Sequence, residues 1–576
     1  MSQLLQSLGA FPNLTTLFLH HNDFTGRKLG DELRNLSSLE SLYLDQCSID
    51  EHSLQSLGAL RSLKNLSLSA LSSSVPSGGF LHLKNLKFLN LSSNTLNNNS
   101  ILQTIGLCDL NNLQELHMYH NNLSGFLPPC LANLTYLQHL DLSSNHLKIP
   151  LSWSPLYNLS KLKHFNGSGN EIFTEKYDYN LSPKFQLESL YLNSHGQGAR
   201  AFFKFLYHQV NLQYMDLTNI QIKGEFPNWL IENNTYLQEL HLENCSLSGP
   251  FYLPKNSHVN LSFLSISMNH FQGQIPSEIG ARLPGLEVLL MSDNGFNGSI
   301  PFSLGNISSL QVLDLSNNSL QGKIPIWIWN MPSLELLDLS RNNFFGRLPP
   351  RFNASSKLRH VYLSRNKLQG PITMAFCDSS EIFALDLSHN NLTEIPPEIG
   401  NLNKIKALNL SHNSLTGPIP PTFSKLKEIE SLDLSYNKLD GEIPPQLIEL
   451  FFLEVFNVAH NNLSGKTLAR VAQFSTFEES CYKDNPFLCG EPLPKKCGGT
   501  MPTSSNNEDN GGFMDMEVFY VSFGVAYIMV LVVICAVLHI NPYWRRAWFH
   551  FIEVNINNCY YFLVENLPIL SKFRFS

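Results

Sequence analysis

The chain has 576 residues, a formal net charge of −8 and a pI near 6.2. An acidic balance of this kind gives no global basic signal for nucleic acid, which argues against nucleic-acid binding. The length alone would suggest about three or four ordinary domains, but one internal repeat fills most of the chain, and repeat proteins form long single units.

The first residues, MSQLLQSLGAFPNL, contain no basic segment followed by an apolar run, so they show no secretory signal peptide. The sequence instead opens inside a repeat, at SLGAFPNLTTLFLHHN. We therefore expect it to be an N-terminally truncated version of a longer exported chain.

From Leu14 to Asn461 the chain falls into register on the pattern L-x-x-L-x-L-x-x-N, in nineteen turns. The steps are mostly 24 or 25 residues, which is the period of a leucine-rich repeat. Each x-L-x-L-x segment is expected to form a short strand, with its leucines inward and the intervening residues outward on a concave parallel sheet. The Asn side chain carries donors and an acceptor, so it is expected to satisfy backbone groups where the chain leaves the strand. The predicted fold is an α/β solenoid.

The outward residue between the two strand leucines predicts where a ligand would bind. In the C-terminal half it is usually Asp (Asp314, Asp338, Asp386 and Asp433), which indicates a scaffold role. Nearer the N-terminus aromatic and polar residues replace it, as is typical of recognition surfaces, although ordinary variation on a solvated face is the alternative. The predicted ligand-binding residues are Tyr43, His117, Tyr119, Tyr191, Tyr214, Glu239, His241, Glu243 and Phe263.

Motifs for chemistry are missing. The chain has no kinase Gly-rich loop, V-A-I-K, H-R-D or D-F-G, and GQGARA at 196–201 falls inside the repeat period rather than in a βαβ unit. It also lacks H-E-x-x-H and paired C-x-x-C motifs, and its histidines are scattered over the turns. The sequence therefore predicts no enzyme activity, no cofactor and no metal site.

Twenty N-x-S/T sequons indicate an ectodomain that passes through the secretory pathway, although NLS arises naturally in this repeat. Asn90, Asn166 and Asn409 lie in the concave column itself, where a glycan would either mask binding or never be added. The expected glycosylation sites are Asn13, Asn133, Asn233, Asn306 and Asn353.

The cysteines fall into pairs with different expected roles. Cys489 and Cys497 lie just past the last repeat and are expected to pair in an exported protein. Cys108 and Cys130 occupy nearly the same phase in adjacent repeats, so they form either a bridge or two separate buried thiols. Cys47 and Cys245 occupy a position where most repeats carry Asn.

The segment Val518–Ile540 contains no Lys, Arg, Asp or Glu, and its 23 residues as a helix reach about 34 Å, enough to cross a bilayer. Arg545 and Arg546 follow it, so the tail is expected in the cytosol and the N-terminal bulk outside. Ser522, Gly524 and Ala526 are candidates for helix packing within the span. Cys559 in the tail is a candidate for palmitoylation.

These features divide the chain into five segments. The predicted segments are a leucine-rich-repeat solenoid over 1–465, a cysteine cap over 466–500, an acidic juxtamembrane linker over 501–517, a transmembrane helix over 518–540 and a short cytoplasmic tail over 541–576.

After the Asn, many turns continue as L-x-G-x-I-P, for example LQGKIP and LTGPIP. Together with NPFLCGEPLP, the span MEVFYVSFGVAYIMVLVV and INPYWRRAWFHFIE, these motifs resemble plant leucine-rich-repeat receptor-like proteins, which have one membrane span and no kinase. The resemblance implies a second sheet along the solenoid and a right-handed superhelix. The last asparagines, from Asn366 to Asn461, are spaced 23 or 24 residues apart, which leaves no room for the non-repeat island found in many members.

The resemblance implies a single-pass plasma-membrane receptor that binds an extracellular peptide, elicitor or glycan. Such receptors signal through an adaptor receptor-like kinase and a co-receptor kinase, most often in plant defence. The alternatives are a developmental peptide-hormone co-receptor and a membrane-held decoy or inhibitor of a microbial enzyme.

Overall fold

The structure is a computed structural model whose chain divides into two units, Met1–Gly498 and Gly499–Ser576. It describes residues 11, 13–72, 80, 82–96, 106–150, 152, 153, 155–173, 183–194, 202–349, 357–373 and 381–497. Within these ranges no helix is both long enough and apolar enough to span a membrane. The expected span 518–540 and the segments flanking it lie outside the described residues.

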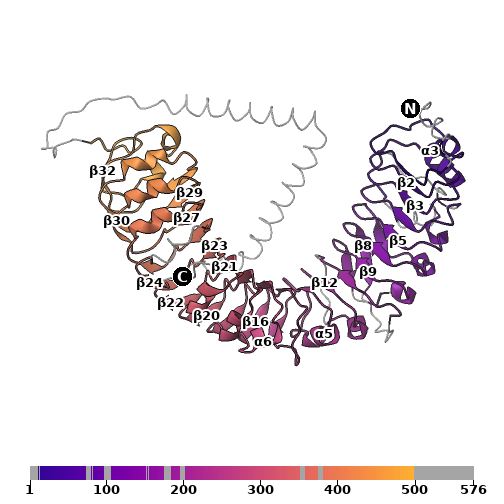
Figure 1. Cartoon of the computed structure of the whole chain (residues 1–576), viewed down its shortest axis with the longest axis horizontal. Coiled ribbons are helices and arrows are strands. Elements are labelled where there is room, and N and C mark those ends of the chain that lie inside the picture. The colour runs from indigo at the N-terminus through magenta and orange to yellow at the C-terminus, as the bar shows by residue number, and fades with distance from the viewer. Residues whose placement is uncertain are drawn as a thin grey trace, which may run out of the picture. The chain divides into compact units, whose positions relative to one another are not determined.

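Nineteen strands form one long sheet in the first unit, the number that the repeat pattern predicts. Consecutive strands pair in parallel with equivalent residues side by side, such as Leu313 with Leu337 and Leu337 with Val361. In Figure 1 these strands follow one another along the inner side of the curved solenoid. The strands are β1 (Thr16–Phe18), β2 (Ser41–Tyr43), β3 (Asn65–Ser67), β4 (Phe88–Asn90), β5 (Glu115–His117), β7 (His139–Asp141), β9 (His164–Asn166), β11 (Ser189–Tyr191), β12 (Tyr214–Asp216), β13 (Glu239–His241), β15 (Phe263–Ser265), β17 (Val288–Leu290), β19 (Val312–Asp314), β21 (Leu336–Asp338), β23 (His360–Tyr362), β25 (Ala384–Asp386), β27 (Ala407–Asn409), β29 (Ser431–Asp433) and β31 (Val455–Asn457).

Shorter parallel sheets run along the edge of the coils, as expected from the L-x-G-x-I-P extension. Gly322 ends one of these strands at φ 102° and Gly346 ends the next at φ 94°, a backbone region that favours glycine. A seven-stranded sheet ends in the coil of LTEIPPEIG, which has no such glycine. The strands are β6 (Ser124–Phe126), β8 (His146–Pro150) and β10 (Glu171–Phe173); β14 (Ser248–Gly249), β16 (His270–Gln274), β18 (Gly295–Gly298), β20 (Ser319–Gly322), β22 (Asn343–Gly346), β24 (Lys367–Gly370) and β26 (Asn391–Leu392); β28 (Thr416–Pro418) and β30 (Lys438–Asp440); and β32 (Ser464–Lys466) and β33 (Phe487–Cys489).

Short helical turns complete the coils on the side away from the long sheet, where α5 and α6 are visible in Figure 1. Many begin just after the Pro of the extension, which cannot donate a backbone hydrogen bond and suits a helix start. The α-helices are α2 (Leu29–Glu32), α3 (Glu51–Ser56), α5 (Asn228–Asn233) and α6 (Ile279–Arg282). The 3₁₀ turns are η1 (Leu57–Ala59), η2 (Leu107–Asp109), η3 (Pro129–Asn133), η4 (Leu156–Asn158), η5 (Lys204–His208), η6 (Phe302–Asn306), η7 (Ile326–Asn330), η8 (Pro397–Asn401), η9 (Pro421–Lys425), η10 (Pro445–Glu449), η11 (Ala472–Ser475) and η12 (Glu479–Cys481).

The core is a continuous column of leucines between the long sheet and these turns. In β21, for example, Leu337 and the following Leu339 are fully buried, whereas the alternate residues Leu336 and Asp338 are only partly buried. This alternation follows from the two-residue period of a strand. The outward positions are therefore free to vary without disturbing the core.

A ladder of asparagines joins each coil to the next. Asn342 donates through Nδ2 to the carbonyl oxygens of Leu315 in the preceding coil, at 2.9 Å, and of Ser340 in its own coil, at 3.1 Å. Its Oδ1 accepts from the backbone N–H of Leu320 at 3.0 Å. The architectural role expected for these asparagines is confirmed, because each buried amide satisfies backbone groups of two coils.

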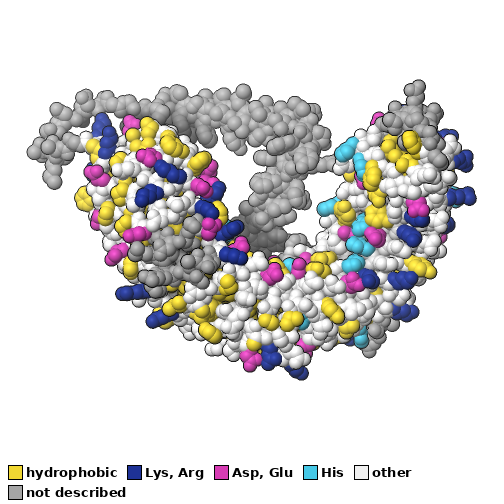
Figure 2. All heavy atoms as spheres, in the orientation of Figure 1, with side chains coloured by type: hydrophobic (Ala, Val, Ile, Leu, Met, Phe, Trp, Pro, Cys, Tyr) yellow, Lys and Arg dark blue, Asp and Glu magenta, His cyan; other side chains and the backbone are white. Residues whose placement is uncertain are grey.

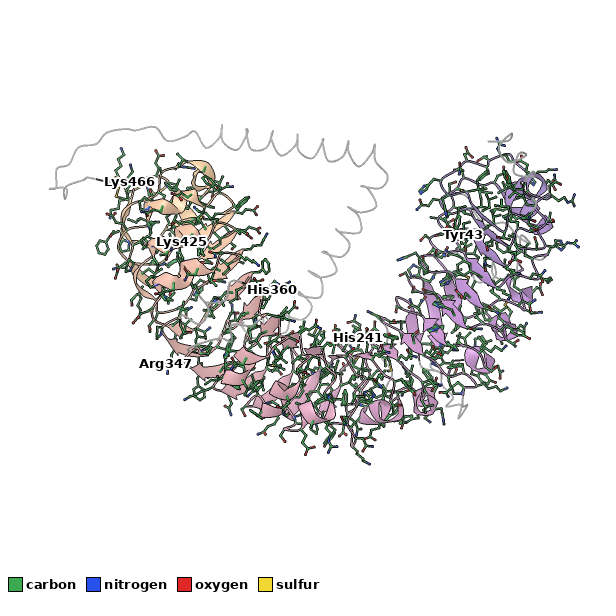
Figure 3. All side chains as sticks on the ribbon, viewed as in Figure 1. Tyr43, His241, Arg347, His360, Lys425 and Lys466 are labelled. Carbon is green, nitrogen blue, oxygen red and sulfur yellow. A yellow bond between two sulfur atoms is a disulfide. The ribbon has the colours of Figure 1, made fainter. Side chains whose placement is uncertain are left out.

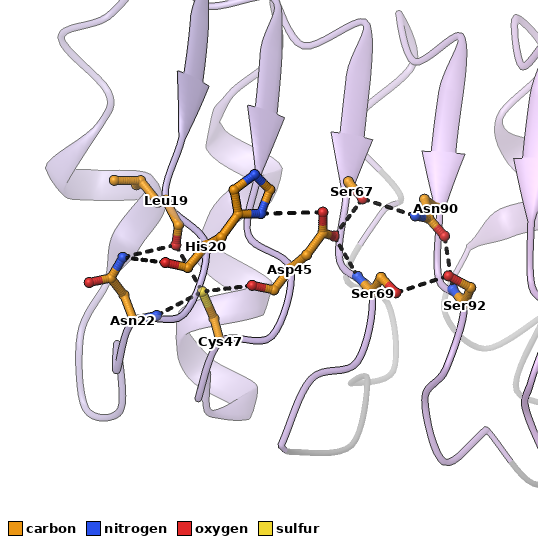
Figure 4. Close-up of polar contacts among 9 residues, drawn as sticks. All are labelled: Leu19, His20, Asn22, Asp45, Cys47, Ser67, Ser69, Asn90 and Ser92. Atoms are coloured by element: carbon orange, nitrogen blue, oxygen red, sulfur yellow. Dashed lines mark hydrogen bonds and ion pairs between the residues drawn. The ribbon is translucent and has the colours of Figure 1, made fainter. Parts of the chain in front are cut away.

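The same ladder accommodates cysteine where Asn is missing. At the Asn position of its coil, the Sγ of Cys47 donates to the carbonyl oxygen of Leu19 at 3.0 Å and accepts from the N–H of Asn22 at 3.4 Å (Figure 4). Cys245 is equivalent and donates to Leu217 at 3.1 Å, and burial raises the pKa of its thiol to about 12. Both cysteines are buried and unpaired, so they serve the scaffold.

The C-terminal end is closed by one further ladder step beyond the nineteen repeats. Asn485 donates to Val458 at 3.0 Å and accepts from the N–H of Leu463 at 3.0 Å. Phe474 and Phe477 cover Phe456 of the last long-sheet strand, with ring centroids 5.2 and 5.6 Å away. A disulfide joins Cys489 to Cys497 in this region.

The Asp column on the C-terminal half of the sheet belongs to the scaffold. Asp338 Oδ1 accepts from the N–H of Ser340 at 2.8 Å, and Asp433 accepts from Ser435 at 2.9 Å. Burial, and then the neighbouring charges of Asp314 and Asp386, raise the pKa of Asp338. The column therefore orders the turn after each strand, while its carboxylates repel one another.

Replacing Asn342 with Ala should lower the free energy of unfolding by about 1–3 kcal/mol, because buried backbone groups lose their partner. Hydrogen exchange of the Leu320 amide should accelerate, since that amide donates to Asn342. The matched control is Asn343→Ala, at the neighbouring half-buried position outside the ladder. Equal exchange rates at Leu320 in Asn342→Ala and the parent chain would contradict the ladder's role.

Asp338→Asn should stabilise the chain at pH 7, because Asn keeps the acceptor for Ser340 and removes the repelled charge. The raised pKa means that the native state holds this proton more tightly than the unfolded chain, in which the Asp pKa is 3.8. Wild-type stability therefore falls as the pH rises from 3.8 through the higher pKa of the folded state. The advantage of the variant should therefore shrink towards pH 3 in thermal unfolding. Asp433→Asn is the control, since its neighbours in the sheet are Asn409 and Asn457. An equal gain in both variants would refute this cause.

Candidate functional site

The outward residues of the long sheet form two columns, made of the first and third residue of each strand. Because the strands pair without a register shift, residues about 24 positions apart in the sequence become neighbours in space. Figure 3 places Tyr43, His241 and His360 on this same strand-bearing side, at different points along the solenoid. Each predicted binding residue within a strand can therefore be located by its strand and column, and Tyr119 and Glu243 follow β5 and β13.

Tyr43 belongs to a small aromatic group at the N-terminal end of the sheet. Its ring stacks on Phe18 of the neighbouring strand, with centroids 4.6 Å apart, and Phe18 is 62% exposed. Just beyond the strand, His20 Nδ1 lies 3.4 Å from Asp45 Oδ2 (Figure 4). Asp45 Oδ1 also accepts from the N–H of Ser69 at 2.8 Å, so polar contacts tie this group to the next coil.

His117 and Tyr119 lie in a second group, which is rich in histidine. The ring of His117 is 4.8 Å from that of His139, and His139 is 5.4 Å from His164 on the next strand. Tyr119 meets His117 edge to face at 6.5 Å. Figure 2 shows histidine side chains gathered on this part of the inner face. Burial, followed by the charges of His117 and His164, lowers the pKa of His139.

A third group brings together five of the predicted binding residues on four consecutive strands, β11, β12, β13 and β15. Tyr214, Glu239 and Phe263 are neighbours in the column made of the first residue of each strand. Tyr191 and His241 lie in the other column, made of the third residue of each strand. His241 stacks on Phe263 with centroids 4.3 Å apart, and its Nε2 lies 3.4 Å from Glu239 Oε2. These contacts form one aromatic and acidic surface rather than five separate side chains.

Polar contacts hold this third group in place. The Tyr214 hydroxyl donates to Gln238 Oε1 at 2.9 Å. Burial, and next the carboxylate of Glu239, raise the pKa of Tyr191, so its hydroxyl remains a donor at neutral pH. Glu243, just beyond the strand, accepts from Ser265 Oγ at 2.5 Å. The surface thus presents ordered hydrogen-bonding groups beside aromatic rings.

The second and third groups are continuous, because β9 pairs with β11. We call the outward surface of β4, β5, β7, β9, β11, β12, β13 and β15 the aromatic face. Phe88 stands at one end of it, 5.4 Å from His117, and Phe263 stands at the other. Of the predicted residues from His117 to Phe263, those within strands lie on this face, and Tyr119 and Glu243 lie just beyond the ends of β5 and β13. Tyr43 lies apart from the face, on β2.

Sequence reasoning missed several residues of this surface, namely His139, Asp141 and His164. The three histidines His117, His139 and His164 are separated by 22 and 25 positions along the chain, so no local motif marks them as a group. The repeat period was the available signal, since positions 117, 139 and 164 fall on three successive strands.

A second missed feature lies on the C-terminal coils, just before the ladder asparagines. The rings of His389, His412, Tyr436 and His460 stack in sequence, with centroids 4.0, 4.1 and 3.9 Å apart. All four residues have positive φ values. Their common place one residue before each Asn was the signal that could have predicted the stack.

The remaining predicted sites divide between described and undescribed residues. Asn13, Asn133, Asn233 and Asn306 are exposed, whereas Asn353 lies outside the described residues. The sequence does not decide whether Cys108 and Cys130 are paired, and in the structure a disulfide joins them. The sites that fall outside the described residues are Ser522, Gly524, Ala526, Arg545, Arg546 and Cys559.

Comparison with known proteins identifies the repeats. A leucine-rich-repeat family model matches residues 284–344 and 380–439, and a second matches 112–134 and 136–160. Cuscuta receptor 1 of Solanum lycopersicum is 32% identical over 238 residues, and receptor-like protein 13 of Arabidopsis thaliana is 35% identical over 231 residues. Each alignment covers 36% of this chain and 21% of the relative, so the matched part spans about a fifth of these relatives' length.

Solved structures agree with this assignment. The Arabidopsis receptor kinase HAESA, in complex with the peptide hormone IDA and the co-receptor SERK1, matches with a TM-score of 0.59 and 27% identity. The match covers 85% of this chain and 80% of that chain. The plant peptide hormone receptor RGFR1, in complex with RGF2, matches in fold with a TM-score of 0.61 at 24% identity, covering 83% of this chain and 95% of that one. The chain thus carries a leucine-rich-repeat domain related to those of plant receptor-like proteins.

Proposed function

We propose that the chain is a plant cell-surface receptor-like protein that binds an extracellular ligand on the aromatic face and signals through associated receptor kinases. The ligand is a peptide, an elicitor or a glycan, and defence is the role we favour. The observation that carries the proposal is the continuous aromatic face, built on a scaffold whose C-terminal half keeps repeating Asp at the same positions.

The chemistry of the aromatic face suits recognition. Rings such as Tyr214 and Phe263 offer apolar area with few rotatable bonds, and neighbouring Glu239 and His241 offer charge and hydrogen bonds. Many of these side chains are already ordered by contacts with one another, which lowers the entropic cost of binding. HAESA, which is similar over most of this chain, is a receptor solved with a peptide hormone bound.

Signalling requires the part of the chain that follows the solenoid. We propose that 518–540 crosses the plasma membrane once, with Arg545 and Arg546 on the cytoplasmic side and Cys559 as a lipid attachment point. Ser522, Gly524 and Ala526 would then let an adaptor kinase helix approach closely. The chain itself lacks kinase motifs, so catalysis belongs to the partners.

Two alternatives use the same face differently. A developmental peptide-hormone co-receptor would bind a hormone together with another receptor. A decoy or inhibitor would occupy a microbial enzyme and would need no kinase, so its effect would survive loss of residues 518–576. Co-precipitation of an adaptor kinase from plant cells, with and without those residues, distinguishes the receptor from the decoy.

The aromatic face can be tested with a phage-displayed random peptide library selected on the purified full chain. Peptides so selected should bind a Tyr214→Ala, His241→Ala, Phe263→Ala variant at least about tenfold more weakly, because truncating an aromatic anchor at an interface typically costs about 1 kcal/mol or more. The measurement is the Kd by biolayer interferometry.

The matched control replaces His360 and Tyr362 with Ala on β23, which occupy the same two columns outside the aromatic face. Binding to this control should remain unchanged. Selected peptides that bind both variants equally well, or that lose binding only to the β23 control, would contradict the proposal.

A further inference from the structure

Two histidines and one aspartate meet on the aromatic face, at the adjacent strands β5 and β7. His117 is paired with Asp141 in the sheet register, and His139 lies two residues before Asp141 on the same outward side. One ligand atom from each of the three residues lies within 4.8 Å of the other two. All three residues are partly buried and remain open to solvent.

We propose that His117, His139 and Asp141 form a binding site for a divalent transition-metal ion, with Zn²⁺ as its best fit. Two imidazole nitrogens and one carboxylate oxygen are a ligand set that suits Zn²⁺ and its neighbours in the first transition row. Hard cations such as Mg²⁺ prefer oxygen ligands alone, so they fit this set poorly. The site adds to the receptor role and does not depend on it.

The geometry needs only side-chain movement to hold the ion. In a tetrahedral site with bonds of about 2.1 Å, ligand atoms lie roughly 3.4 Å apart. The separations of up to 4.8 Å therefore close by at most about 1.4 Å, which rotations about the side-chain bonds of His117 and His139 can supply. The backbone stays in place because β5 and β7 are held in register on both sides.

Surrounding groups already orient the ligands. Asp141 Oδ1 accepts from the N–H of Ser143 at 2.9 Å and from its hydroxyl at 2.7 Å. Among the described residues, its Oδ2 receives only a long contact from Asn166 Nδ2, at 3.4 Å, and so can bind the ion. Glu115 Oε2 lies 3.8 Å from His117 Nε2 and provides a nearby negative charge. Outer contacts of this kind fix ligand orientation and strengthen metal binding.

Other histidines of the sheet lack this arrangement. His164 adjoins His139, but its Nδ1 is bonded to Ser189 Oγ at 2.9 Å. His241 is stacked on Phe263, and His360 lies 6.4 Å from Tyr362 and 6.3 Å from Phe383. Among the residues that the structure describes, no other group of three potential ligands comes as close together.

Three protein ligands leave at least one coordination position open to solvent. In zinc sites of this type a water or a donor atom of a bound molecule takes that position. The site therefore offers the aromatic face a point where an extracellular carboxylate, imidazole or amine could be held directly by the ion.

The proposal can be tested by titrating the purified full chain with Zn²⁺ against a chromophoric chelator. The parent chain should bind one Zn²⁺. The substitutions His117→Gln, His139→Gln and Asp141→Asn should each lower the affinity for this ion at least about tenfold. Asn at 141 keeps the acceptor for Ser143, and circular dichroism confirms that each variant is folded. His360→Gln, an outward histidine at the same column position as His139, should bind like the parent, and Mg²⁺ should not compete.

A glycan on Asn166 would cover the site, because Asn166 is paired with Asp141 in the sheet and lies in an N-G-S sequon. The titration is therefore repeated with Ser168→Ala, which removes the sequon and keeps the backbone N–H that Asn166 binds. Zn²⁺ binding that is restored by Ser168→Ala and lost again with His139→Gln supports the site. Absence of the tight Zn²⁺ in both the parent and Ser168→Ala, or its full retention in His139→Gln, would overturn the proposal.

Discussion

The asparagine ladder is the constraint on which the rest of the structure depends. Each ladder amide, such as Asn342, bonds to backbone groups of its own coil and of the preceding one, so a coil cannot shift along its neighbour without leaving buried groups unpaired. The asparagine ladder therefore allows no shift, even of one residue, between neighbouring strands of the long sheet. Cys47 and Cys245 show that the position tolerates another small donor, provided that it still reaches the carbonyl oxygen of the preceding coil.

Because the register is fixed, residues that recur with the repeat period in the sequence form continuous columns on the surface of the sheet. Residues about 24 positions apart become lateral neighbours, so a substitution in the outward columns builds a patch without any change to the core. Where the column keeps Asp or Asn, as at Asp338 and Asn409, the side chain caps the following turn and serves the scaffold. Where it becomes His117, Tyr191 or His241, the side chain packs against neighbouring aromatic or acidic side chains instead, and we propose that this surface meets the ligand. We regard this exchange as the way the chain acquires a recognition surface.

Much of the fold follows from the sequence for the same reason. The nineteen strands, the ladder asparagines and the bend glycines such as Gly322 all repeat, and repetition makes each position's environment readable. Contacts between unlike side chains do not repeat. The stacking of His241 on Phe263 and the meeting of His117, His139 and Asp141 depend on rotamers and on which coils adjoin, and neither is visible along the chain. The closing step at Asn485 was also missed, because its coil no longer carries the leucine pattern.

The central claim is that the aromatic face, and not the scaffold half of the sheet, meets the extracellular ligand. Photo-crosslinking in plant cells tests it most directly, with a photo-reactive phenylalanine analogue placed at position 214 or, separately, at position 360 of the full chain. Illumination in the presence of extracellular fluid should yield a discrete adduct from position 214 and none from position 360. Equal adducts from both positions, or an adduct from position 360 alone, would contradict the account.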